Sequence, residues 1–144
     1  LFESACRVPL IIRAPGFESS AGSKVAALTE FVDLYPTFAE LAGVGDKVPE
    51  AVQGRSLVPL LKDPSGQEWE PQPAYSVMGN KRAVQRSIRT ERYRYSRYTT
   101  GEEELYDHAN DPEEFTNQAS NLEYASTLRS LRMQMDEIQT KANR

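Results

Sequence analysis

The segment at residues 106–114, YDHANDPEE, holds the side chains with the widest chemical scope. His108 is the only histidine of the chain, so a Ser-His-Asp triad or a histidine-based metal site could be built only here. Carboxylates, the ligands that calcium prefers, surround it at Asp107, Asp111, Glu113 and Glu114. Their spacing is not that of an EF-hand loop, and the segment has no glycine for the sharp central turn. A turn is the simpler interpretation, with Asp111-Pro112 beginning a short helix whose positive end favours the two glutamates.

Cys6 is the other reactive side chain and the only cysteine. The neighbouring Arg7 could favour its thiolate, but a cysteine in this apolar setting is more typical of a small buried residue. A single cysteine forms neither an internal disulfide nor a CxxC site, so the redox compartment stays open. The glycines of AGVGDKV lack the spacing of a phosphate-binding loop.

Residues 86–98, RSIRTERYRYSRY, alternate arginine with tyrosine, a pairing that binds anions, sugars or stacked bases. A hairpin explains the same string without a ligand, because a period of two places Tyr93 and Tyr95 on a core face and Arg92 and Arg94 toward solvent. Both interpretations remain open at this level.

Charge is uneven along the chain although the net charge is only −4. Between Lys81 and Arg97 seven basic residues accompany one acid, whereas from Gly101 onward there are ten acids and four bases. The two regions either neutralise each other in the fold or leave a basic surface for an anionic ligand.

The elements that must position these residues change character along the chain. RVPLIIRA at residues 7–14 is a short apolar run typical of a strand buried on both faces, and VAALTEFV at 25–32 predicts a second strand. Helices are expected after Asp33 and Ser56, both of which are good amino-terminal caps. A polar, proline-rich stretch at 62–73 then marks a boundary.

Beyond the boundary the period changes. Segments 74–79, 82–100 and 103–108 predict an antiparallel meander with a reversal near Thr90 to Arg92. A long amphipathic helix follows from Ser120, which is expected to form a capping box with Glu123. Its apolar stripe is expected to pack on one face of the meander and consists of Leu122, Ala125, Leu128, Leu131, Met135 and Ile138.

Length and composition suit one globular domain or a piece of a larger protein, with 144 residues, 39% hydrophobic and 26% charged. No apolar run approaches the roughly 18 residues that span a bilayer. The chain begins LFESACRVPLIIRAPG, without Met or a polar lead-in, so we expect residue 1 to lie inside a longer protein.

Five blocks in order carry a family resemblance: LFESACRVPLIIRAPG, TEFVDLYPTFAELAGV, QGRSLVPLLKDP, RSIRTERYRYSRY and ELYDHANDPEE. Together they closely resemble the C-terminal part of the type I sulfatases of the alkaline-phosphatase-like superfamily, and most of all the iduronate-2-sulfatase branch. The resemblance implies an α/β fold. Residues 1–62 would be the end of the large mixed sheet and helices of the catalytic domain, and residues 63–144 a small antiparallel sheet packed against the long C-terminal helix.

The resemblance also implies the chemistry of the whole enzyme, which is hydrolysis of sulfate esters on sulfated glycans such as glycosaminoglycans. The family nucleophile is a formylglycine made in a C/S-x-P-x-R motif, but Cys6 is followed by RVPLI. Formylglycine and calcium are therefore expected outside this chain, with no catalytic residue and no metal ligand within it. Arg7, with Glu3, matches positions near the floor of the active site, and Arg89 belongs to the subdomain that borders the substrate cleft. Arg7 and Arg89 are thus the candidate substrate-binding residues.

The expected partners are the amino-terminal catalytic portion of the same enzyme and a sulfated sugar, with neither nucleic acid nor membrane. The family suggests a periplasmic, secreted or lysosomal location, and this piece alone is expected to be inactive. Two alternatives remain. One is part of a phosphoesterase of the same superfamily, and the other is a non-catalytic module that binds anionic glycans through the arginine and tyrosine hairpin.

Overall fold

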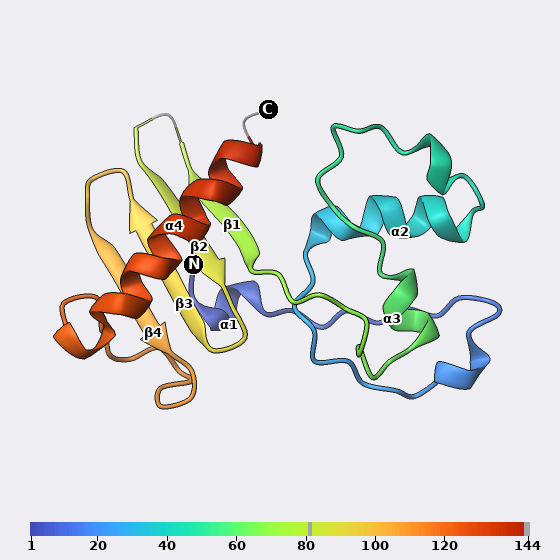
Figure 1. The fold of residues 1–144 in the computed structure, drawn as a ribbon, viewed down its shortest axis with the longest axis horizontal. Coiled ribbons are helices and arrows are strands. Elements are labelled where there is room, and N and C mark those ends of the chain that lie inside the picture. Colours follow the sequence, from blue (N-terminus) through green and yellow to red (C-terminus); the bar gives the residue numbers. More distant parts are fainter. Residues whose placement is uncertain (81, 143–144) are drawn as a thin grey trace. The chain divides into compact units, whose positions relative to one another are not determined.

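The computed structural model describes residues 1–80 and 82–142, which fall into two compact units (Figure 1). Unit 1 combines Leu1–Pro9 with the chain from Pro73 onward, and unit 2 is Leu10–Gln72. The first nine residues therefore belong with a sheet that begins more than sixty positions later. The assignment of residues 1–62 to a catalytic domain stays a prediction.

Unit 1 is built on an antiparallel sheet in the order β1-β2-β3-β4. Its strands are β1 (Ala74–Gly79), β2 (Val84–Arg89), β3 (Tyr93–Tyr98) and β4 (Glu103–Asp107). Each strand pairs with the next one along the chain, and the β2–β3 turn falls at residues 90–92, so the predicted meander is confirmed.

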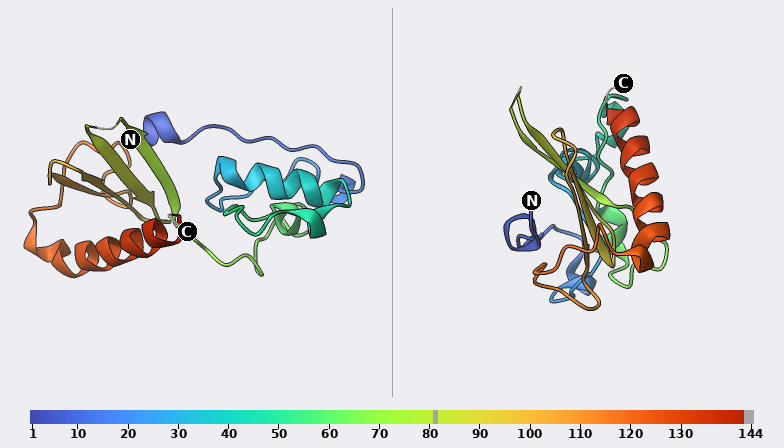
Figure 2. Two further views of the ribbon diagram at one scale, coloured as in Figure 1. Left: turned by 90° about the horizontal axis from the view of Figure 1, so that it is seen from above. Right: turned by 90° about the vertical axis from the view of Figure 1, so that its left-hand side faces the viewer.

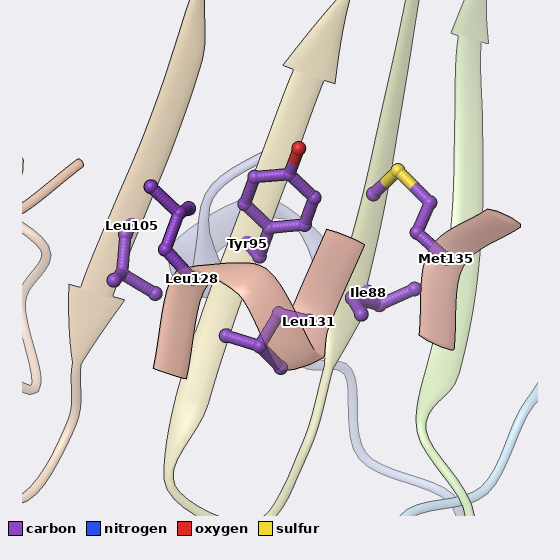
Figure 3. Close-up of a cluster of buried hydrophobic side chains, with 6 residues drawn as sticks. All are labelled: Ile88, Tyr95, Leu105, Leu128, Leu131 and Met135. Atoms are coloured by element: carbon purple, nitrogen blue, oxygen red, sulfur yellow. The ribbon is translucent and has the colours of Figure 1, made fainter. Parts of the chain in front are cut away.

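The helix α4 (Ala125–Ala142) covers one face of this sheet. Ile88, Tyr95 and Leu105 are cross-strand neighbours on that face, and Leu128, Leu131 and Met135 of α4 pack against them (Figure 3). Each such fully buried side chain contributes about 2 kcal/mol of hydrophobic stabilisation. The predicted packing of the helix on the meander is confirmed.

The start of this helix differs from the prediction. Asn121, not Ser120, is the capping residue, and its side chain accepts a hydrogen bond of 3.0 Å from the backbone N–H of Glu123. A 3₁₀ turn at Leu122–Tyr124 precedes α4, and Leu122 is exposed. Ala125 is exposed as well, so the buried stripe begins at Leu128, about two turns later than the spacing suggested.

The helix α1 (Glu3–Cys6) lies on the opposite face of the sheet (Figure 2, right). This face carries polar side chains, yet Ser87, Arg94 and Ser96 are all buried. The ring of Phe2 also packs against Tyr106, with ring centroids 5.9 Å apart. Both faces of the sheet are thus covered, one by an apolar helix stripe and the other by a short segment from the beginning of the chain.

Unit 2 contains the helices α2 (Leu34–Leu41) and α3 (Val58–Lys62) and 3₁₀ turns at Glu18–Ser20, Phe31–Asp33 and Gly45–Lys47. Ser56 is not the N-cap of α3 as predicted. The N-cap is Leu57, and the Oγ of the preceding Ser56 accepts from the N–H of Val58, the first helical residue, at 3.2 Å. The Asp33 side chain does not cap α2. It closes the preceding turn by accepting from Glu30 N at 2.8 Å and bridges to Arg55 N at 2.9 Å.

Neither residues 7–14 nor residues 25–32 form the predicted strands. A strand exists through backbone hydrogen bonds to a neighbour, and neither segment pairs with a strand in the described part of the chain. Ile11 is 90% exposed as a result. Separately, no helix within residues 1–80 and 82–142 has the length and apolar character needed to cross a membrane.

Candidate functional site: an ionic clasp on the polar face of the sheet

Five charged or titratable side chains meet on the sheet face that carries α1. They come from α1, β2, β3 and the turn after β4. We call this group the Glu3 clasp, and its members are Glu3, Arg89, Arg94, His108 and Glu114.

Arg94 is the centre of the clasp and is only 2% exposed. Its Nε donates to Glu114 Oε1 at 2.6 Å and its Nη2 donates to Glu3 Oε2 at 2.6 Å. A buried guanidinium requires such charged partners, and its planar fork can serve two carboxylates at once. The prediction that Arg94 faces solvent is wrong. The side chain points away from Tyr95 as strand alternation requires, but α1 covers that face.

Glu114 holds three groups together. Its Oε1 also lies 2.7 Å from His108 Nε2, and its Oε2 accepts from the backbone N–H of Glu3 at 2.7 Å. Glu114 has a φ of 60°, a left-handed conformation that residues other than glycine seldom adopt. The chain therefore turns here instead of beginning the short helix expected at Asp111-Pro112, while the predicted turn itself is confirmed.

Glu3 receives the second set of contacts. Arg89 Nε donates to Glu3 Oε2 at 3.1 Å, beside the bond from Arg94. Burial alone raises the pKa of the Glu3 carboxyl, but the hydrogen bonds and charges of Arg89 and Arg94 together lower that pKa below its ordinary value. Glu3 is therefore an ionised partner of two arginines.

The clasp does not suit a divalent cation. Ligand atoms of Glu3, His108 and Glu114 do lie within 4.8 Å of one another. Arg94, however, contacts both carboxylates, and Arg89 contacts one of them. A calcium ion would have to sit among guanidinium groups that already neutralise its ligands. Cys6, on the same short helix, also lacks the C/S-x-P-x-R context that formylglycine requires.

A second ionic group lies at the end of β4. Arg92 holds Asp107 with two parallel bonds of 2.7 Å, and Tyr124 adds a third at 3.0 Å. The hydrogen bonds from Arg92 are the main reason that the pKa of Asp107 lies far below its ordinary value. Arg92 and Arg94 are thus both paired with carboxylates of the protein itself, but only Arg94 is buried, since the Arg92 side chain is 53% exposed.

The two candidate substrate-binding residues have different surroundings. The Arg89 side chain is 15% exposed, and it bonds to Glu3 and to the carbonyl of Thr90. The Arg7 side chain is 81% exposed, and its Nη1 is 3.9 Å from Glu3 Oε1. The structure therefore joins both arginines through Glu3, and of this pair Arg7 offers its charge to solvent.

Comparisons with known proteins agree on the family. The family model "N-sulphoglucosamine sulphohydrolase, C-terminal" matches residues 1–141. A sulfatase of Formosa agariphila is 31% identical over 132 residues, which cover 92% of this chain and 24% of the relative. An N-acetylglucosamine-6-O-sulfatase of Bacteroides thetaiotaomicron is 33% identical over 147 residues, which cover 96% of this chain and 26% of the relative.

Solved structures share the fold of this chain. The protein BT4656, solved in complex with its substrate D-glucosamine-2-N,6-O-disulfate, has a TM-score of 0.76 at 31% identity, with 85% of this chain and 26% of that chain covered. A phosphonate monoester hydrolase of Agrobacterium radiobacter has a TM-score of 0.74 at 24% identity, with 89% and 28% covered, and supports the fold alone. The expected alkaline-phosphatase-like α/β class is confirmed.

The chain spans about a quarter of the length of the curated relatives that it matches, between 24% and 26% in the two cases above. The family match nevertheless runs over almost all of its residues. The chain therefore belongs to the sulfatase family, as a member of the group defined by the C-terminal region of N-sulphoglucosamine sulphohydrolase.

Proposed function

We propose that this chain is the C-terminal portion of a sulfatase that, at full length, hydrolyses sulfate esters of glycosaminoglycan-like sugars. The observation that carries the proposal is the family match over residues 1–141. A 2-O-sulfated uronic acid is the first substrate to test, because a Delta 4,5-hexuronate-2-O-sulfatase of Bacteroides thetaiotaomicron is 30% identical over 151 residues. The proposed specificity is therefore that of an iduronate-2-sulfatase-like enzyme.

Arg7 makes the direct contact with the anionic sugar in this proposal, and Arg89 supports it through Glu3. The exposed guanidinium of Arg7 supports this assignment, since arginine binds sulfate and carboxylate groups through charge-assisted hydrogen bonds. Formylglycine and calcium belong to the part of the enzyme outside this chain. Supporting that view, the carboxylates of the clasp are already paired with arginines.

The partner in the proposal is the amino-terminal catalytic portion of the same protein. Phe31, Tyr35 and Phe38 support it, because their spacing places them on one face of the turn that leads into α2 and of α2 itself, and all three are exposed. Contiguous exposed aromatic side chains mark surfaces that another part of a protein covers. The proposal also includes export to a periplasm, the cell exterior or a lysosome.

The test compares the full-length protein, with its nucleophile matured, against the 144-residue chain. Sulfate released from a panel of sulfated disaccharides is measured by ion chromatography, and phosphate and phosphonate esters are assayed in parallel. We expect sulfate release by the full-length protein and none by the chain alone. Phosphoester hydrolysis without sulfate release would favour the phosphoesterase alternative, and glycan binding without any hydrolysis would favour the binding module. Sulfate release by the chain alone would overturn its proposed inactivity.

A further inference from the structure

We propose that Glu114 is a positioning residue for Arg7. In this inference Glu114 fixes the helix α1 through Glu3 and so sets where the Arg7 guanidinium lies. The inference rests on the proposed function, in which Arg7 contacts the anionic substrate.

Glu114 holds Glu3 at two points. Its Oε2 accepts directly from the backbone N–H of Glu3 at 2.7 Å, which fixes the main chain at the first residue of α1. Its Oε1 accepts from Arg94 Nε at 2.6 Å, and the same guanidinium donates to Glu3 Oε2 at 2.6 Å. One carboxylate thus orients both the backbone and the side chain of a residue 111 positions away.

Arg7 depends on that anchor. The helix α1 has only four residues, so its own backbone bonds cannot keep it folded or oriented. The N–H of Arg7 donates to the carbonyl of Glu3 at 2.9 Å, which carries the position of Glu3 to the next turn. The Glu3 carboxylate lies 3.9 Å from the Arg7 guanidinium. At this distance it attracts the positive charge of Arg7 but forms no hydrogen bond, so the N–H groups of the guanidinium stay available to a ligand.

Glu114 is itself rigidly held. Its backbone N–H donates to the carbonyl of Asp111 at 3.2 Å. The Asp111 carboxylate accepts from the N–H groups of Phe115 and Thr116 at 3.1 Å and 2.8 Å, just beyond Glu114. A residue whose backbone is held by its own turn can pass that position to another segment through its side chain.

Asp107 provides a matched control. Like Glu114 it is a buried carboxylate near the end of β4 that pairs with an arginine of the β2–β3 hairpin region. Its carboxylate is held by Arg92, Asn110, Tyr124 and the backbone N–H of Ala109, none of which belongs to the segment 1–9. Asp107→Asn therefore removes a comparable buried charge without touching the anchor of α1.

The kinetic test uses the full-length enzyme and the disaccharide that it hydrolyses best. We expect Glu114→Gln and Arg7→Ala each to raise KM by about tenfold, the loss typical of one charge-assisted hydrogen bond. The double variant Glu114→Gln, Arg7→Ala is expected to have the same KM as Arg7→Ala alone. If Glu114 acts only by positioning Arg7, its replacement has no further effect once Arg7 is removed. Asp107→Asn is expected to lower Tm but to leave KM unchanged. If the effects of Glu114→Gln and Arg7→Ala on KM add up in the double variant, the inference is overturned.

A second readout does not need activity. Amide hydrogen exchange of the peptide that contains Glu3 is measured in the full-length protein, with Glu114→Asp as a milder variant in case the glutamine protein does not fold. We expect faster exchange in the Glu114 variants and wild-type exchange in Asp107→Asn. Unchanged exchange in the Glu114 variants would overturn the inference whatever the kinetics. A different result would be faster exchange in the Glu114 variants together with an unchanged KM in Arg7→Ala. That result would refute the substrate contact of Arg7 in the proposed function, and with it the positioning role of Glu114, but not the contacts of the Glu3 clasp.

Discussion

Replacing Arg94 by methionine tests whether the clasp stabilises unit 1. Methionine keeps much of the length of the side chain but removes the charge that serves Glu114, Glu3 and, at 3.3 Å, the hydroxyl of Ser87. The two carboxylates would then face each other in a buried site, where the low dielectric makes unpaired charge costly. We expect the variant to be strongly destabilised.

The remaining contacts set the size of the effect. Glu3 keeps Arg89, and Glu114 keeps His108 and the backbone N–H of Glu3, so neither carboxylate loses all its partners. Removing one partner from a buried pair costs about 3–5 kcal/mol, and because of the surviving contacts we expect a loss of ~3 kcal/mol here. With a urea m-value of roughly 1–2 kcal/mol/M for a small unit, the unfolding midpoint falls by about 1.5 M or more.

Spectroscopy separates the two units. Trp69 is the only tryptophan and lies in unit 2, whereas Tyr35 is the only tyrosine outside unit 1. Near-UV circular dichroism of tyrosine therefore reports unit 1, and tryptophan fluorescence reports unit 2. We expect Arg94→Met to shift the tyrosine transition and leave the tryptophan transition in place.

Arg97→Met is the control for this experiment. It makes the same substitution on the same strand, but Arg97 and its partner Asp136 have side chains 31% and 60% exposed. Such a surface pair contributes about 0–1 kcal/mol. A midpoint shift in Arg94→Met no larger than that in Arg97→Met would refute the reasoning that the clasp stabilises the fold.

Two further predictions concern other parts of the chain. Arg92 lowers the pKa of Asp107, so the stability that this pair contributes is present above the ordinary pKa of about 3.8 and is lost as pH falls below it. In acid unfolding followed by tyrosine circular dichroism, Asp107→Asn should flatten the pH dependence below that value, and an unchanged slope would contradict the assignment. Gly54→Ala should destabilise unit 2, because a Cβ at this position would lie 2.0 Å from the carbonyl oxygen of Val32. The Trp69 fluorescence transition should then move to lower urea, and an unmoved transition would show that the backbone relaxes at no cost.

Hydrophobic periodicity in the sequence predicted the elements whose packing depends mainly on segments close to them along the chain. The meander and the packing of α4 follow from periodicity, because Ile88 and Tyr95 need only strand neighbours and the facing helix to become buried. The strands expected at 7–14 and 25–32 failed for the converse reason. Their branched apolar residues favour extended chain, but a buried strand also needs paired neighbours, and residues 1–80 and 82–142 provide none for these two segments.

The clasp shows where periodicity stops being informative. The alternation Tyr93-Arg94-Tyr95 correctly places Arg94 and Tyr95 on opposite faces, yet it cannot tell whether the second face meets water or another segment. That depends on Glu3 and Glu114, which lie 91 and 20 positions from Arg94. Arg94 can be buried only because carboxylates from both segments pair with it. The arginine on the polar face of the sheet therefore requires an opposite charge at the start of the chain. An acidic residue early in a chain, an arginine inside a tyrosine-rich strand and a glutamate after an Asp-Pro turn carry no signal separately, and only the fold makes them one site.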